Sequence, residues 1–442
     1  MINRREFIKF GAVGAGGAAA ARFVPSLLDG DGEGGPLSGP GAKPTSSTST
    51  ETTPSTAIST ESAKTVARAA KKSASERVLV IVDLAGGNDG LNTVVPINDP
   101  AYRSLRTTVA LDEKELHSLG KEFGAHPSLE RLSKRGLAVI AGVGVSNPEG
   151  SHFEMARRWA MADLDGHGAP TTGFFGRLAD VVGSRDAPAV ALGLGSGYSP
   201  ALVSAWAPSI NLRSLESAQM FRPNRDDVNL TAFQTAYRRM ASTASSPGAN
   251  GPRAAAAIGM VQALRTAGLV SQDDETNDGL PGTDLGRSLG SALRLIRQPS
   301  LGLRIIHITH DGFDTHSSAI DQHGQRLSEF DEAVDAFLGA AESSGLGGRV
   351  LVATTSEFGR RAKDNGSNGL DHGAASVALL AGPVNAGVHG EYSSLTKLDT
   401  DDNLIAKVPL GDYFATLSTW LGVSPGDVLG NGHSPVSGVF QN

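Results

Sequence analysis

Cysteine is absent from all 442 residues of this chain. Without thiols, the protein has no disulfide bonds, no thiolate metal ligands, no thiol nucleophile and no thiol redox chemistry. Its stability must therefore come from a hydrophobic core that is large enough to hold the fold by itself.

A long apolar run and a strong charge imbalance are also lacking. The small-residue stretch GAVGAGGAAAA at 11–21 is too short and too rich in Gly and Ala for a membrane span, which needs roughly 20 strongly apolar residues. The net charge of −7 is modest and unclustered, so nothing indicates a nucleic-acid partner. No repeat of fixed period is visible.

The first residues contain a paired arginine. NRREFIKF at 3–10 resembles a twin-arginine (Tat) export signal, with Arg4 and Arg5 followed by any residue, Phe and a second apolar residue. Asn3 stands where Ser or Thr is usual, and an ordinary basic N-terminus is the alternative. We expect the Tat translocase as a partner during export and an extracytoplasmic location, with cleavage of the signal left open. Tat carries folded proteins, which favours a metal cofactor loaded in the cytoplasm.

Three segments divide the chain. After a signal segment at 1–28, residues 29–75 form a Gly-, Pro-, Ser- and Thr-rich tract that lacks the apolar content for folding, so we expect a disordered linker. Residues 76–442 then form one large domain. The stretch from about 200 to 300 reads as a helical insertion with mobile loops.

Short, continuously apolar runs indicate strands buried on both faces, as in parallel sheets covered by helices. Helical spacing at 126–136 and 319–345 lies between such runs. The alternation predicts an α/β/α sandwich with a mostly parallel central sheet. The six expected strands are 78–84, 137–143, 189–194, 303–309, 350–356 and 376–382.

Polar clusters follow these strands, where open α/β sheets gather functional groups. GGNDG at 86–90 follows the first strand and presents Asp89, either as a metal ligand or as a plain turn. Asn88 beside it is a candidate substrate-binding residue. Asp83, inside the apolar run, is a rival ligand that we interpret as a polar group satisfied at the sheet edge.

The fourth strand leads into HDGFDTH at 310–316. Residues two apart on extended backbone project to one side, so Asp314 and His316 can bind one cation. Carboxylate and imidazole suit Zn, Mn or Fe, and suit Ca less. His310 and Asp311 are expected to orient the pair, with His310 a further candidate ligand. The alternative is a hydrogen-bonded corner.

Two more clusters accompany the fifth and sixth strands. SEFGRR presents Glu357 as a candidate ligand, with Arg360 or Arg361 placed to bind an anionic substrate group. An internal Glu–Arg salt bridge is the alternative. Asp371 and His372 are adjacent candidate ligands, and adjacent ligands suit a two-metal site.

A helix start at 149–162 adds a candidate nucleophile. Ser151 and Glu154 form a capping box, which is the structural interpretation. A Ser hydroxyl at a helix N-terminus also lies in a positive field that steadies an alkoxide or a phosphoryl group. Ser151 and the adjacent His152 are therefore the candidate catalytic residues.

The chain resembles a bacterial family of Tat-exported proteins of unknown function, through GGNDGLNTVVP, AHPSL, SHFE, HDGFDTH, SEFGRR and GSNGLDHG in that order. That family is grouped with the alkaline phosphatase, sulfatase and phosphoglycerate mutase superfamily. The resemblance implies an α/β/α sandwich and a two-metal site at the carboxyl ends of the strands.

The resemblance also assigns roles to residues. It implies Asp89 as the first Asp, Ser151 as nucleophile, Asp314 with His316 as the Asp and His pair, and His372 as the final His. Glu357 followed by Phe stands where the superfamily has Asp then His, so one ligand is lost or comes from Asp371. Asp314 and His316 are also closer together than is usual there.

These observations predict an exported, metal-dependent hydrolase of phosphate or sulfate esters. We expect one or two divalent ions (Zn, Mn or Ca) and a small-molecule or polymer ester as substrate. The alternative is a catalytically reduced member that binds metal or polymer as an extracytoplasmic assembly component. The sequence indicates neither the substrate nor the oligomeric state.

Overall fold

The computed structural model describes residues 76–168, 170–195, 197–215, 235, 236, 239, 242 and 278–441. The expected signal segment, the linker and most of the expected helical insertion lie outside these residues. Within the described part, no helix is both long and apolar enough to cross a membrane.

A nine-stranded sheet forms the centre of the domain, in the order β11-β5-β10-β9-β1-β8-β6-β7, with β12 also pairing with β5. All six strands that the sequence predicts are present in it. The strands are β1 (Val78–Ala85), β5 (Ala138–Gly144), β6 (Ala191–Leu194), β7 (Ser209–Leu212), β8 (Ile305–Asp311), β9 (Val350–Thr355), β10 (Ser376–Ala381), β11 (Gly387–His389) and β12 (Val408–Pro409).

Strand β10 is antiparallel to both of its neighbours, β5 and β9. Every other pairing in this sheet is parallel. The prediction of a mostly parallel sheet is therefore confirmed. Because β10 runs in the opposite direction, its first residue lies at the edge of the sheet where the parallel strands end.

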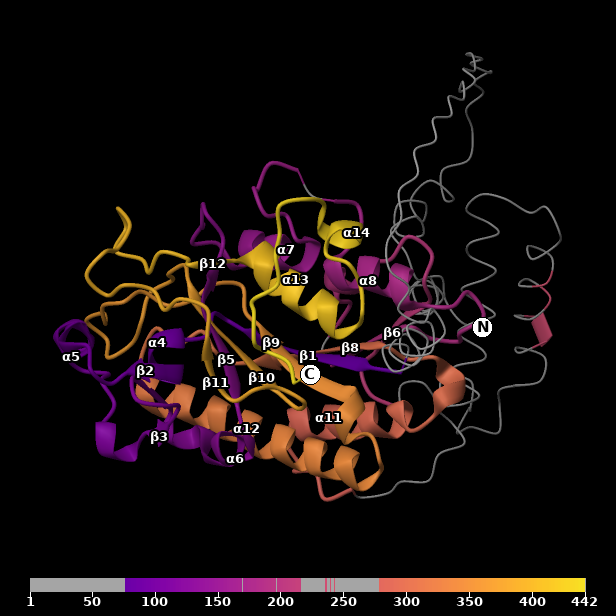
Figure 1. Cartoon of the computed structure of the whole chain (residues 1–442), viewed down its shortest axis with the longest axis horizontal. Helices are drawn as coiled ribbons and strands as arrows, with labels where there is room; N and C mark the ends of the chain where they lie inside the picture. Colours follow the sequence, from indigo (N-terminus) through magenta and orange to yellow (C-terminus); the bar gives the residue numbers. More distant parts are fainter. Residues whose placement is uncertain are drawn as a thin grey trace, which may run out of the picture.

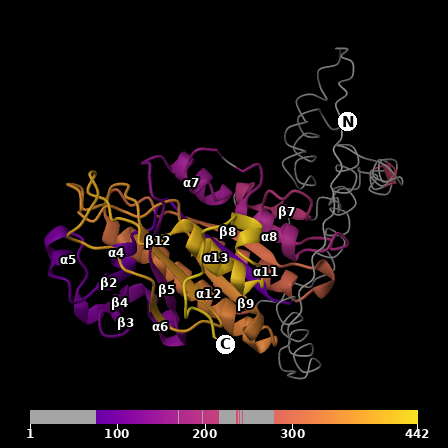
Figure 2. The ribbon, with the colours of Figure 1, turned by 45° about the horizontal axis from the view of Figure 1, so that its top comes forward.

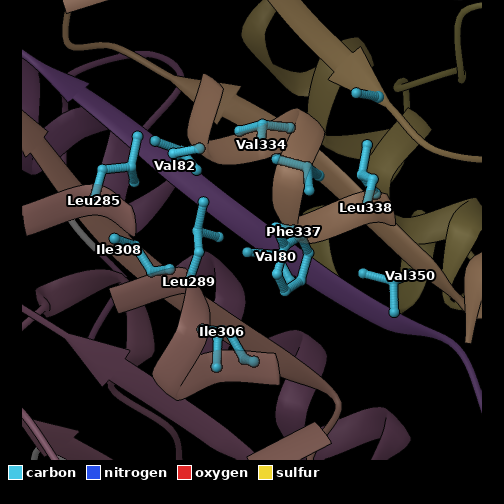
Figure 3. Packing of buried hydrophobic residues seen from close by; sticks show 14 of the residues in the cluster. Val80, Val82, Leu285, Leu289, Ile306, Ile308, Val334, Phe337, Leu338 and Val350 are labelled. Carbon is cyan, nitrogen blue, oxygen red and sulfur yellow. The ribbon is translucent and has the colours of Figure 1, made fainter. Parts of the chain in front are cut away.

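Strand β1 is covered on both faces, which explains why its sequence is apolar at every position except Asp83. Val80 and Val82 face a core that includes α11 and α12, while Leu79 and Ile81 face a second core that includes α7, α8 and α13. Side chains alternate along a strand, so a strand covered on both faces must be apolar at every position. Figure 3 shows the first of these cores around Val80, Val82 and Phe337.

Helices cover both faces of the sheet, as Figures 1 and 2 show, which confirms the α/β/α sandwich. One face carries η2 (Pro127–Leu129), α6 (Glu130–Arg135), α11 (Asp284–Ile296), η5 (Pro299–Leu301) and α12 (Ala319–Ser343). The other carries α7 (His152–Met161), α8 (Phe174–Val182), η3 (Pro200–Leu202), α13 (Leu410–Trp420) and α14 (Gly426–Leu429). Shorter helical turns are α4 (Gly90–Thr93), α5 (Pro100–Leu105), η1 (Glu113–Glu115) and η6 (Gly347–Arg349).

Several elements were not predicted. The described start of the expected helical insertion contains the strand β7, which pairs in parallel with β6, whereas its described end contains α11, a helix as expected there. A second sheet of three strands, in the order β2-β4-β3, consists of β2 (Val94–Pro96), β3 (His117–Ser118) and β4 (Phe123–Ala125). Strands of two or three residues are too short for an apolar pattern to identify them, and Ser209 and Asn211 interrupt the apolar run at β7.

Candidate metal centre

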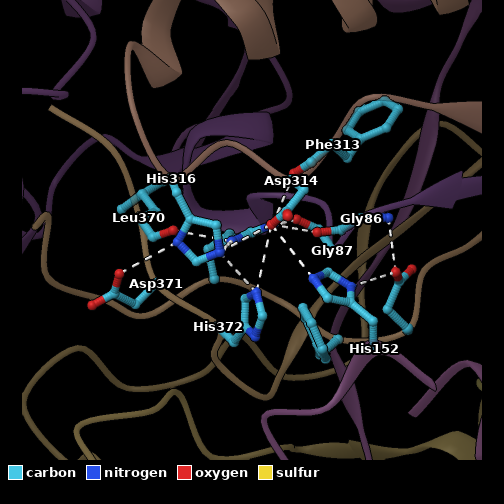
Figure 4. Close-up of polar contacts among 12 residues, drawn as sticks. Gly86, Gly87, His152, Phe313, Asp314, His316, Leu370, Asp371 and His372 are labelled. Carbon is cyan, nitrogen blue, oxygen red and sulfur yellow. Dashed lines mark hydrogen bonds and ion pairs between the residues drawn. The ribbon is translucent and has the colours of Figure 1, made fainter. Parts of the chain in front are cut away.

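Four polar side chains meet where the parallel strands end. His152 is the first residue of α7, Asp314 and His316 lie in the loop after β8, and His372 lies shortly before β10. Figure 4 shows the three imidazole rings around the Asp314 carboxylate. We call these four residues the His–Asp cluster. The sequence predicted all four as site residues, with His152 as catalytic rather than as a ligand.

Neighbouring oxygen atoms orient two of the rings. Nδ1 of His152 lies 3.0 Å from Oε1 of Glu357, and Nδ1 of His372 lies 2.7 Å from the carbonyl oxygen of Gly150. Carbonyl and ionised carboxylate oxygens only accept hydrogen bonds, so each Nδ1 carries the proton. In the neutral rings Nε2 is then the atom with the free lone pair, which is the form that binds metals.

The third ring has a looser partner on the same side. Nδ1 of His316 lies 3.5 Å from Oδ1 of Asp371, an ion-pair distance rather than a hydrogen bond. Asp371 also accepts a 3.1 Å hydrogen bond from the side chain of Asn365. Of the two adjacent candidate ligands, Asp371 therefore lies behind His316, whereas His372 belongs to the cluster.

The three Nε2 atoms converge on one carboxylate oxygen. Oδ1 of Asp314 lies 3.1 Å from Nε2 of His316 and 3.5 Å from Nε2 of both His152 and His372. Nε2 of His152 is buried and has no hydrogen-bond partner. Ligand atoms of His152, Asp314 and His372 all lie within 4.8 Å of one another, close enough to share one ion. Three imidazoles and one carboxylate form a donor set that is typical for zinc.

Arg360 holds the loops of this site together. Its guanidinium is fully buried and donates to Oδ1 of Asp314 at 2.5 Å. Burial alone would raise the pKa of Asp314, but the hydrogen bond and charge of Arg360 outweigh it and hold that pKa below its usual range. We expected Arg360 to bind substrate, whereas the structure uses its other donors on backbone carbonyls: those of Gly86, Gly87, Phe313 and Leu370.

The two glycines after β1 permit this close packing. Gly86 and Gly87 have φ values of 115° and 88°, which side chains rarely tolerate. A Cβ atom on Gly86 would lie 2.4 Å from the backbone nitrogen of Asp314, and one on Gly87 would lie 2.5 Å from the ring of Phe358. A side chain at Gly86 would displace the loop that carries Asp314, and one at Gly87 would displace the ring of Phe358.

Glu357 contacts the cluster through His152. It is 7% exposed, and its Oε1 accepts hydrogen bonds from the backbone N–H of Gly86 at 2.8 Å and from His152. We expected Glu357 as a ligand or as the partner of an arginine. The structure instead makes it the carboxylate that orients His152.

Asp89 lies in a buried ion pair, away from the cluster. Its two oxygens accept hydrogen bonds of 2.8 and 2.7 Å from the guanidinium of Arg106, and its side chain is 1% exposed. It also caps α4 through the N–H of Asn92. Burial would raise the pKa of Asp89, but Arg106 outweighs it and lowers the pKa. Asp89 is therefore a turn residue, which is the alternative that the sequence left open, and not a ligand at the cluster.

Two other expected site residues are buried elsewhere. The side-chain oxygen of Asn88 lies 2.9 Å from Nε2 of His323, and its backbone N–H donates to Oγ of Ser356. Nε2 of His310 lies 3.0 Å from the carbonyl oxygen of Arg326. Burial lowers the pKa of His310. Asn88 is therefore not placed to bind substrate, nor His310 to bind the same ion as the cluster.

Ser151 precedes the cluster by one residue. It is exposed, and its Oγ accepts a 3.4 Å hydrogen bond from the backbone N–H of Glu154, so it caps α7 as the structural interpretation expected. The Glu154 carboxylate accepts from Arg157. In the chain, Ser151 lies between Gly150, whose carbonyl orients His372, and His152 itself.

The sequence analysis did not identify the role of the Gly150 carbonyl oxygen, and it gave too little weight to Asp83. No sequence signal marks Gly150, because any residue has a carbonyl oxygen. Asp83 accepts a 2.7 Å hydrogen bond from Oγ1 of Thr355, as expected for a polar group at the sheet edge. Burial, with Glu357 nearby, raises the pKa of Asp83 to about 7. That unusual environment could have been suspected from its position in an apolar run.

Known structures of similar fold include enzymes of the alkaline phosphatase and sulfatase type. Lipoteichoic acid synthase LtaP from Listeria monocytogenes is 9% identical, with 80% of this chain and 74% of that chain covered and a TM-score of 0.37. The PsFucS1 sulfatase from Pseudoalteromonas sp. is 11% identical, with coverage of 83% and 72% and a TM-score of 0.37. Alkaline phosphatase from the Antarctic bacterium TAB5 is 11% identical, with coverage of 70% and 93% and a TM-score of 0.32.

At these TM-scores the likeness carries no argument about activity. A comparison with curated proteins finds no match. One family model covers most of the chain, from residue 76 to residue 432. This match agrees with the family resemblance that the sequence blocks indicated. The chain belongs to the family described as "Protein of unknown function (DUF1501)".

Proposed function

We propose that the His–Asp cluster binds one divalent cation and that the protein is an exported, metal-dependent hydrolase of phosphate or sulfate esters. The observation that carries the proposal is the convergence of three Nε2 atoms on Oδ1 of Asp314. Zinc or manganese fits this donor set better than calcium, which prefers oxygen ligands alone.

The residues present fit such an ion. Nε2 of His152 is buried without a partner, and a buried polar atom without a partner costs about 1–3 kcal/mol. Nε2 atoms of His316 and His372 face each other at 2.8 Å. A cation would give the buried Nε2 atom of His152 a partner, and it would take the place of the hydrogen bond between His316 and His372.

A metal ion at this point would provide Lewis acidity toward an anionic ester group. The chain supplies the rest of the environment. His152 is the first residue of α7, a helix of ten residues, so the positive end of the helix dipole faces the cluster. The side chain of Asp314 is 48% exposed, so the site is open to a substrate. An anionic group is therefore favoured there.

Hydrolysis needs a nucleophile beside that group. The hydroxyl of Ser151, one residue before His152, is the nearest candidate in sequence, and a water molecule is the alternative. In either case an oxygen attacks phosphorus or sulfur, and the ester oxygen leaves with a proton as an alcohol. Attack by Ser151 would leave a covalent ester that a second water molecule cleaves.

One observation favours the alternative function, a metal-binding protein without catalysis. Asp89 is bound to Arg106 and Ser151 Oγ caps α7, so the first Asp and the nucleophile that the family resemblance implied are both engaged elsewhere. A single ion held by four residues can serve assembly or binding without chemistry. The experiment below separates the two functions.

The test combines metal content with a substrate screen. The full chain, purified without chelators, should contain about one equivalent of metal per chain, and it should cleave 4-nitrophenyl phosphate, sulfate or phosphonate esters when Zn or Mn is added. His372→Gln should lose both properties, whereas Glu342→Gln, which changes an exposed carboxylate on α12, should keep both. Metal without cleavage of any ester would favour the binding function. Absence of metal from the wild type would contradict the proposal.

A further inference from the structure

A pocket of about 530 Å³ has Glu357 in its lining. It is bounded by α7, by the segment from the end of β6 to η3, and by the carboxyl ends of β1, β8 and β9. Its volume is within the range of small-molecule sites. Glu357 lines the pocket and also orients His152, so the pocket and the cluster share one residue.

Aromatic and other apolar side chains form the walls of this pocket. Phe153 is 91% exposed and Tyr198 is 56% exposed, and both line it. Trp159 and Phe175 line it more deeply and are buried. Large aromatic side chains left open to water, next to a pocket, indicate ring faces available for contact with a ligand.

Groups that can both donate and accept hydrogen bonds form the floor. They are Asp83, Thr355, Thr309 and His307, which come from β1, β9 and β8. Burial lowers the pKa of His307 to about 4, so its ring is neutral and has one donor and one acceptor. The raised pKa of Asp83 leaves part of its population protonated near neutral pH. Such a mixture matches hydroxyl groups, which also donate and accept.

The described lining of the pocket favours a neutral ligand over an anion. Arg157 is its one Lys or Arg side chain among the described residues, and its guanidinium is engaged by Glu154 at 2.8 and 2.5 Å and by Asp163 at 2.7 Å. Glu357 and Asp83 add negative character to the floor. The anionic part of a substrate is thus favoured at the cluster rather than here.

We propose that this pocket binds a neutral ring bearing several hydroxyl groups, the alcohol part of the ester whose anionic group lies at the His–Asp cluster. Carbon–hydrogen faces of the ring pack on Phe153 and Tyr198, while its hydroxyl groups bond to the floor. The link to an ester rests on the proposed function, but binding of the ring does not. The substrate class is therefore a phosphate or sulfate ester of a sugar or cyclic polyol.

The test uses the full chain in the presence of EDTA, which separates this inference from the metal-dependent function. Saturation-transfer NMR with methyl glucoside, methyl galactoside and myo-inositol should detect binding of at least one probe. The variant Phe153→Ala with Tyr198→Ala should bind that probe about tenfold more weakly. Ile405→Ala removes another exposed apolar side chain, 43% exposed and outside the pocket, and should bind as the wild type does.

Three results would overturn the inference. They are no binding of any of these probes to the wild type, equal binding by the double variant, and tighter binding of ethanolamine or choline than of the hydroxylated rings. The last would identify the pocket as a cation site. The variant His372→Gln should bind the neutral probe as the wild type does, so loss of the metal site leaves this test intact.

Discussion

Nε2 of His316 lies 2.8 Å from Nε2 of His372, although 56 positions separate the two residues in the chain. Nδ1 of His372 faces the carbonyl of Gly150, so Nε2 of His372 is the acceptor in the hydrogen bond between the two rings. Burial lowers the pKa of His372, and the hydrogen bond to Gly150 offsets this only in part, so the ring is neutral at neutral pH. A cation bound at Nε2 of His372 would take the place of the hydrogen bond between the two rings.

The first prediction concerns that cation. Asp314→Asn combined with His316→Gln should abolish metal binding and keep the fold at lower stability, because Arg360 loses its carboxylate partner but keeps its four carbonyl acceptors. Metal at ~100 times its dissociation constant should stabilise the wild type by about 2.7 kcal/mol and leave the double variant unchanged. Melting curves with and without Zn or Mn measure this. An equal metal response in both proteins would place the site elsewhere.

Glu357→Gln should weaken metal binding without removing it. The amide can still accept from the Gly86 N–H, but it loses the charge that holds Nδ1–H of His152. Loss of such a supporting partner typically costs about 10–100-fold in metal affinity. Competition titration with a coloured chelator measures the change. Glu342→Gln, which removes an exposed ion-pair carboxylate, is the control and should bind metal normally.

Asp89→Ala should destabilise the protein by about 3–5 kcal/mol, because it leaves the charge of Arg106 buried without a partner. Glu113→Ala, which breaks a half-exposed pair with Arg103, should cost less than ~1 kcal/mol. Urea unfolding of the metal-free proteins compares them. If Asp89→Ala kept full stability but lost metal binding, Asp89 would be a metal ligand after all.

The raised pKa of Asp83 predicts a pH dependence of stability. Burial, and then the charge of Glu357, raise it from 3.8 to about 7, so the folded protein holds a proton that the unfolded chain has lost. The free energy of unfolding should therefore fall as pH rises from about 4 to about 7 and level off above that. Asp83→Asn should remove this component. Urea midpoints of both proteins at pH 5 and pH 8 measure the difference, and parallel pH profiles would contradict the prediction.

Export is the remaining prediction, and it concerns residues outside the described part of the chain. Replacing Arg4 and Arg5 by Lys should leave the protein in the cytoplasm, since twin-arginine signals depend on that pair. Cell fractionation of the producing bacterium, with antibody detection, measures the distribution. Unchanged export of the variant would show that another route is used.

Much of the fold could be predicted because its physical cause is local. A strand buried on both faces has to be apolar at every position, so six of the nine strands of the large sheet were visible as continuous runs. The region of the site followed from the rule that parallel strands present functional groups at one edge. Asp314, His316 and His372 were predicted in this way as candidate ligands, and the structure brings them together.

The partner of each charged group could not be predicted, because a side chain's role depends on what distant segments bring beside it. Asp89 and Glu357 look alike in sequence as carboxylates after strands. In the folded protein, Asp89 pairs with the guanidinium of Arg106, whereas Glu357 pairs with the ring of His152. The direction of β10, which brings His372 to the cluster, was also invisible, since an antiparallel strand buried on both faces has the same apolar pattern as a parallel one. The sequence by itself therefore determined which residue types reach this edge, and only the tertiary structure decided which of them face a common point.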